Sequence, residues 1–104
     1  MLKSLEERED TEMKINIDKA IVDRSIEFYG KEKQSIVCME ECSELIQAIS
    51  KELRGKSDIN HLVEEMADVL ICIELLKKMY NIGDIELESW VYAKQRRIKE
   101  RMRE

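Results

Sequence analysis

Hydrophobic residues recur at three- and four-residue steps along most of this chain, and three glycines interrupt the pattern. That period is typical of amphipathic α-helices, and proline, which would break a helix interior, is absent. We therefore expect the glycines at 30, 55 and 83 to separate helices. The pattern predicts helices from residue 16 or 18 to 29, from 31 to 54, from 57 or 58 to 82, and from a cap at Asp84 to the C-terminus. An all-α, four-helix bundle-like fold follows.

Two of these helices carry more apolar surface than one partner helix can cover. The second has a main apolar stripe formed by Cys38, Cys42, Leu45, Ile46, Ile49 and Leu53. A mixed stripe beside it contains Val37, Glu41, Glu44 and Ala48. The third helix is apolar around most of its circumference, which requires neighbours on several sides. Because the chain offers little other mass, we expect a homodimer or homotetramer.

Composition limits the number of domains, the classes of binding partner and the location of the protein. A chain of 104 residues makes one domain, in which we expect residues 1–14 to form a charged, possibly disordered arm and residues 15–104 the helical domain. Its net charge of −5 disfavours binding to nucleic acid or to anionic membranes. The longest apolar run, Val69 to Ile73, is far shorter than the ~20 residues of a membrane span. With no signal-peptide pattern near the N-terminus, we expect a cytoplasmic location.

Paired carboxylates are the strongest chemical feature of the sequence. Glu41 and Glu44 lie three residues apart on the second helix, and Glu65 and Asp68 repeat that spacing on the third, so each pair shares one helix face. If the two helices pack antiparallel, four carboxylates converge on a partly buried seam. Their repulsion is relieved by protonation or by a hard cation, and ligands that are all oxygen favour Mg²⁺ or Mn²⁺. The alternative is an ordinary solvated acidic surface.

Two segments resemble a known family. EECSELIQAI (residues 40–49) followed by HLVEEMADVLICIELL (residues 61–76) is similar to the ExxE…ExxD signature of the MazG-like all-α nucleoside triphosphate pyrophosphohydrolases. The resemblance implies a helical homo-oligomer that uses Mg²⁺, with Mn²⁺ as a possible substitute, to cleave a nucleoside triphosphate between its α and β phosphates. The products would be a nucleoside monophosphate and pyrophosphate.

The same resemblance assigns roles to individual residues. It implies metal ligation by Glu41, Glu44, Glu65 and Asp68, activation of water by Glu40 or Glu41, and phosphate binding by Lys94 and Arg97. The alternative interpretation is that Lys94 and Arg97 are ordinary solvated residues near a helix C-terminus, where positive charge is favourable to the helix dipole. His61, one turn before Glu65, could donate to a phosphate or a carboxylate, although a histidine in a first helical turn is often without a function.

Two other functions stay open at this point. Phosphoribosyl-ATP pyrophosphohydrolase shares the acidic helices of the superfamily. A non-catalytic dimeric interaction or regulatory module would need neither metal nor substrate, and its basic tail at residues 96–103 lacks the interleaved aromatic residues of a nucleic-acid-binding segment. A metal-dependent rise in melting temperature would favour the enzyme.

Overall fold

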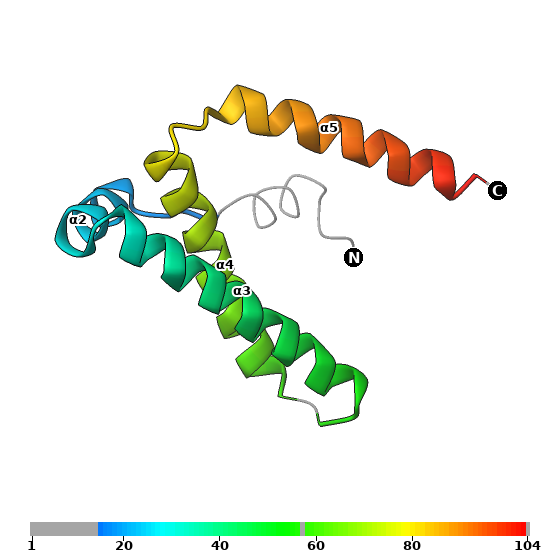
Figure 1. Cartoon of the computed structure of the whole chain (residues 1–104). Helices are drawn as coiled ribbons and strands as arrows, with labels where there is room; N and C mark the ends of the chain where they lie inside the picture. The colour runs from blue at the N-terminus through cyan, green and yellow to red at the C-terminus, as the bar shows by residue number, and fades with distance from the viewer. Residues whose placement is uncertain (1–14, 57, 104) are drawn as a thin grey trace, which may run out of the picture.

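The computed structural model describes residues 15–56 and 58–103, and all regular structure in that part of the chain is α-helical. The helices are α2 (Lys19–Tyr29), α3 (Lys31–Leu53), α4 (Ile59–Met79) and α5 (Asp84–Arg101), shown in Figure 1. The predicted all-α fold is confirmed. The charged arm predicted for residues 1–14 lies outside the described residues.

Short polar side chains and one glycine set three of the helix ends. The Asp18 carboxylate caps α2 and accepts a hydrogen bond from the Ala20 amide at 2.9 Å. Asp58 caps α4 in the same way through the His61 amide at 3.2 Å, which satisfies amides that a helix start leaves unpaired. Gly30 ends α2 with a φ of 91°, a backbone conformation that other residues rarely adopt.

The predicted boundary between the last two helices is wrong in two details. α4 ends at Met79 rather than at residue 82, because Asn81 turns the chain with a left-handed φ of 57°. The N-cap of α5 is Gly83, and Asp84 is the first helical residue. The Asp84 carboxylate is paired with the Lys77 ammonium group of α4, so it is not available as the cap.

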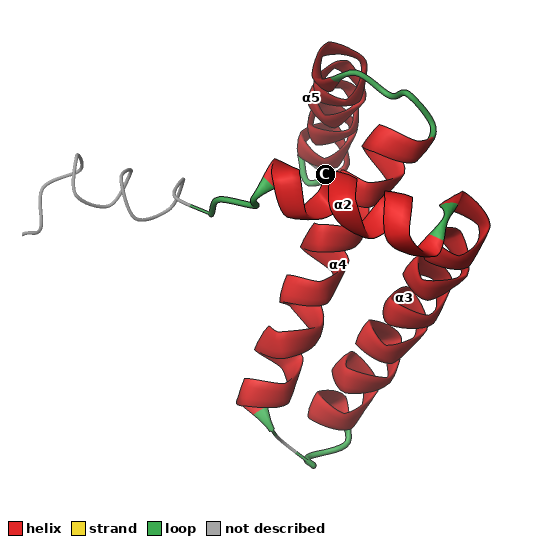
Figure 2. Ribbon diagram, turned by 90° about the vertical axis from the view of Figure 1, so that its left-hand side faces the viewer, coloured by secondary structure: helices red, strands yellow, loops and turns green. Residues whose placement is uncertain are grey.

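α3 and α4 lie side by side and antiparallel, and α2 crosses both at the end away from their connecting loop (Figure 2). A small core forms where the three helices meet. Its buried members are Val22, Cys38, Cys72 and Leu75, with Ile17, Ile26, Leu76 and Met79 packed around them. This core fixes one end of the α3–α4 pair, and the opposing faces of the two helices continue from it toward the loop.

The face of α3 that meets α4 differs from the one that apolar patterning favours. Cys38 and Ala48 are buried, but Ile46 is 67 % exposed and Leu53 is 85 % exposed. The side of α3 that faces the seam therefore combines Cys38 of the main apolar stripe with Val37, Glu41 and Ala48 of the mixed stripe, and most of the main apolar stripe is exposed. On α4 the seam likewise buries Glu65. One neighbour covers only one side of each helix, and here that side carries the carboxylates.

Apart from the ion pair between Asp84 and Lys77 of α4, α5 packs against none of the other described helices and extends away from them (Figure 1). The Cα radius of gyration is consequently 16.8 Å, against about 13 Å for a compact domain of this length. Leu87, Trp90, Val91 and Ile98 of α5 are all at least partly open to solvent. Exposed apolar area on this scale is typical of a surface that another protein covers.

Candidate metal centre

Carboxylates from α3 and α4 meet across the seam between these helices. One oxygen each from Glu41, Glu44 and Glu65 lies within 4.8 Å of the other two. The fourth predicted ligand, Asp68, lies close enough to Glu41 for its carboxylate charge to raise the pKa of Glu41. Spacing of three residues aligns each pair on one face, and the antiparallel packing of the helices brings the two faces together.

Two of these carboxyl groups are buried without a hydrogen-bond donor. Glu65 is 5 % exposed, and Glu41 is partly buried. The Oε1 atom of each is shielded from solvent and accepts no hydrogen bond from any described residue. A buried acceptor without a partner is unfavourable, so this seam has unused capacity to bind a donor or a cation.

Burial and mutual repulsion favour the neutral forms of both groups. Desolvation, followed by the neighbouring charges of Asp68 and Glu44, raises the pKa of Glu41 from 4.5 to about 7. Desolvation and the charges of Glu44 and Asp68 also raise the pKa of Glu65. No lysine or arginine among residues 15–56 and 58–103 forms a salt bridge with this group. A divalent cation would supply the missing positive charge, and oxygen ligands of this kind fit Mg²⁺ or Mn²⁺.

Comparison with known proteins agrees with this geometry. Residues 31–104 match the MazG nucleotide pyrophosphohydrolase domain, which is most of the chain. The chain belongs to the MazG family. No curated protein and no solved structure matches it. Membership confirms the family resemblance and indicates a nucleotide pyrophosphohydrolase, of a family whose enzymes typically depend on a divalent metal.

The remaining residues predicted for the MazG site lie outside the carboxylate group. Glu40 is exposed on α3 and lines an open hollow there together with Glu44 and Met39. Lys94 and Arg97 are exposed on α5, which does not contact α3 or α4 within one chain. A single chain thus brings Glu41, Glu44 and Glu65 together, with Asp68 beside Glu41, but it does not bring the predicted phosphate-binding pair to them.

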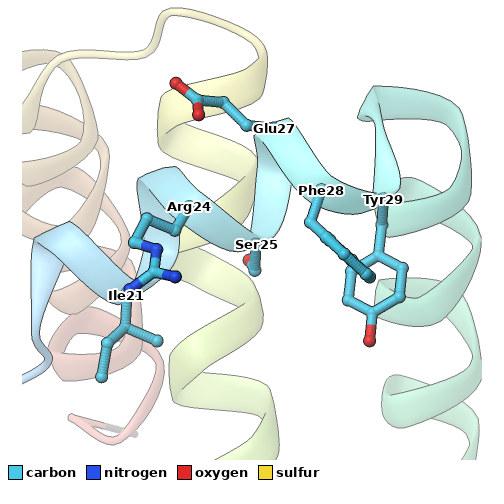
Figure 3. A pocket seen from close by; sticks show the side chains of 6 residues that line it. All are labelled: Ile21, Arg24, Ser25, Glu27, Phe28 and Tyr29. Carbon is cyan, nitrogen blue, oxygen red and sulfur yellow. The ribbon is translucent and has the colours of Figure 1, made fainter.

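Another surface hollow lies apart from this group, on α2 (Figure 3). Its lining residues are Ile21, Arg24, Ser25, Glu27, Phe28 and Tyr29, all from that one helix. The rings of Phe28 and Tyr29 meet edge to face with centroids 4.8 Å apart. None of the four predicted metal ligands lines this hollow.

Sequence reasoning gave His61 little weight, but the structure places its imidazole against two glutamates. It lies 3.7 Å from Glu64 and 3.9 Å from Glu65. The four-residue step from His61 to Glu65 was the only sequence signal of this contact. The same step also occurs in the solvent-exposed first turn of an ordinary helix, so the spacing alone does not identify a site.

Among the described helices, none is long and apolar enough to cross a membrane.

Proposed function

We propose that this MazG domain hydrolyses a nucleoside triphosphate between the α and β phosphates and releases a nucleoside monophosphate and pyrophosphate. The observation that carries the proposal is the four-carboxylate group in the α3–α4 seam: Glu41, Glu44 and Glu65 have oxygens within 4.8 Å of one another, and Asp68 lies beside Glu41. Two buried oxygens of this group lack a hydrogen-bond partner. Family membership supplies the class of reaction. The four-carboxylate group supplies a place where a polyphosphate and its counter-ion can be held.

Glu41, Glu44, Glu65 and Asp68 would hold Mg²⁺, or Mn²⁺ in its place. When bound, the ion would polarise the phosphate oxygens and lower the pKa of a water molecule. The attacking water forms a bond to the α phosphorus, the bond to the bridging oxygen breaks, and pyrophosphate leaves. Glu40 or Glu41 takes the proton of the water, a role that suits a carboxylate beside the scissile bond.

The phosphate-binding residues are proposed to come from a second copy of the chain. Lys94 and Arg97 do not reach the carboxylates of their own chain, whereas α3, α4 and α5 all have uncovered apolar side chains, among them Ile46, Leu70 and Trp90. Packing these surfaces together in a homodimer or homotetramer would bury them and bring α5 of one copy toward the seam of another. Such an arrangement is the usual symmetric solution for a self-complementary surface.

A product assay tests the reaction. The purified chain is incubated with each common NTP and dNTP, and with phosphoribosyl-ATP, in Mg²⁺, and monophosphate, diphosphate, phosphate and pyrophosphate are resolved. We expect monophosphate and pyrophosphate in equal amounts. Glu41→Gln should lower the rate at least about 10²-fold, and Glu27→Gln, an exposed acid on α2, serves as the matched control. Absence of pyrophosphate from every substrate would contradict the proposal.

Two further variants separate the proposed roles. If Glu40 is the base, Glu40→Gln keeps the rise in melting temperature caused by Mg²⁺ but loses turnover, whereas Glu41→Gln loses both. If Lys94 acts on the partner's seam, Glu41→Gln and Lys94→Ala are each inactive alone, but their mixed dimers recover activity at about half of their sites. No recovery in the mixed dimers would place Lys94 elsewhere.

A further inference from the structure

A second group of possible metal ligands lies at the start of α4. His61, Glu64 and Glu65 are spaced so that all three share one side of the helix. The imidazole Nδ1 lies 3.7 Å from Glu64 Oε1, and Nε2 lies 3.9 Å from Glu65 Oε2. Both distances are too long for hydrogen bonds. One possible ligand atom from each residue lies within 4.8 Å of the other two.

The buried side chain of Glu65 points at the imidazole and has capacity for a ligand. It is only 6 % exposed and its Oε2 atom is the one that lies 3.9 Å from His61, while its Oε1 atom accepts no hydrogen bond within the described part of the chain. The same residue belongs to the group formed with Glu41 and Glu44. A carboxylate has two oxygens, so Glu65 can contribute to one group without leaving the other.

We propose that His61, Glu64 and Glu65 form a second metal site, which binds a divalent transition-metal ion such as Zn²⁺ or Co²⁺ beside the carboxylate group. An imidazole with carboxylates suits these ions, whereas Mg²⁺ takes oxygen ligands. Two ligand atoms that bind one ion at about 2.1 Å lie about 3 to 4 Å apart. One ion binds only one of the two imidazole nitrogens. Since one possible ligand atom from each residue lies within 4.8 Å of the other two, rotation of the side chains is enough to bring the three atoms to that separation.

The exposure of the site is consistent with access for an ion from solution. The Glu64 side chain is 72 % exposed and that of His61 is 37 % exposed, so water can complete the coordination on the outer side while Glu65 closes the inner side. The proposal goes beyond nucleotide hydrolysis and does not depend on it. It states that the chain distinguishes two kinds of ion by the presence or absence of one imidazole.

The chain has a single histidine, which gives the test an unambiguous signal. The ¹⁵N-labelled full chain, purified without a histidine tag, is titrated with Zn²⁺ while the imidazole resonances are recorded by NMR. We expect saturable shifts complete at one equivalent, broadening of the same signals by Co²⁺, and persistence of the zinc-bound signals in excess Mg²⁺. The imidazole is a better reporter than total bound zinc, because Cys42 is exposed and can bind zinc on its own.

Variants then identify the ligands. His61→Gln and Glu64→Gln should each weaken Zn²⁺ binding by at least about tenfold, and Glu27→Gln should leave it unchanged, with circular dichroism as the check on folding. Imidazole resonances that do not move with Zn²⁺ or Co²⁺ would overturn the second site, whether or not the variants fold. Mg²⁺-dependent hydrolysis together with an unmoved imidazole rejects only the second site. Zinc bound at His61 without any hydrolysis rejects only the proposed function.

Discussion

Replacing Glu41 with glutamine is expected to stabilise the metal-free protein above neutral pH. Burial and the charges of Asp68 and Glu44 raise the pKa of Glu41 from 4.5 to about 7 in the folded chain. Unfolding removes those causes, so between about pH 4.5 and 7 the folded state binds more protons than the unfolded state. The contribution of Glu41 to stability is therefore fully present below about pH 4.5 and is lost as the pH rises through about 7. At pH 8 the ionised Glu41 opposes folding.

The magnitude follows from the size of the shift. One pKa unit corresponds to about 1.4 kcal/mol, so a shift from 4.5 to about 7 amounts to about 3.5 kcal/mol at most, and solvent screening around a partly buried group reduces this value. Glutamine has the shape of the protonated acid and offers an amide donor to Asp68, but it cannot ionise. We expect Glu41→Gln to raise the free energy of unfolding by about 1 to 3 kcal/mol at pH 8. Each kcal/mol raises the melting temperature by about 4–8 °C in a domain of this size.

Thermal unfolding followed by circular dichroism measures the effect. Wild type, Glu41→Gln and the control Glu27→Gln are compared in EDTA at pH 4 and pH 8, at one protein concentration, because the stability of an oligomer depends on concentration. The gain of Glu41→Gln should be present at pH 8 and absent at pH 4. Added Mg²⁺ should then stabilise wild type and control but not Glu41→Gln. Equal or lower stability of Glu41→Gln at pH 8 in EDTA would refute the reasoning.

Three other measurements follow from the structure. Mg²⁺ affinity measured by calorimetry should increase from pH 6 to pH 8, because Glu41 must lose its proton to bind the ion; an affinity independent of pH would contradict its role as a ligand. Leu75→Ala should lower the free energy of unfolding in urea by about 2–5 kcal/mol, since Leu75 is buried in the core, and a change below about 1 kcal/mol would contradict that packing. Trp90→Asp should reduce the particle mass measured by light scattering, and an unchanged mass would exclude this part of α5 from the interface.

Helix positions were predictable because local residues determine them. Asp18 and Asp58, each one of the two helix starts that the pattern allowed, are the N-caps of α2 and α4, and the positive φ of Gly30 marks the break between α2 and α3. The predicted end of α4 was too late because the helix ends were inferred from the glycines. The residue that turns the chain after α4 is Asn81, which adopts a left-handed conformation although it is not a glycine. Asp84 was misassigned because its partner, Lys77, belongs to another helix, and a local capping rule contains no information about such a contact.

The four carboxylates were predictable as a group, but their surroundings were not. Spacing places Glu41 with Glu44 and Glu65 with Asp68, and family resemblance indicates that the two pairs meet. Periodicity alone does not say which stripe of α3 faces α4. Patterning favours the main apolar stripe as the buried face, whereas Ile46 in that stripe is 67 % exposed in the single chain. The orphaned oxygens and the raised pKa of Glu41 depend on this choice of face.

That choice of face separates metal binding from catalysis within the proposed function. The helix surfaces that meet inside one chain carry the carboxylates, so Glu41, Glu44 and Glu65 are already together, with Asp68 beside Glu41, before any partner arrives. The more apolar surfaces, on which burial yields more free energy, are uncovered and available to a second copy. Lys94 and Arg97 lie on α5, which beyond its first residue packs against no other helix in the described part of the chain. If α5 docks on another copy, a single chain can bind the metal, but only the assembled protein can position the phosphates for hydrolysis.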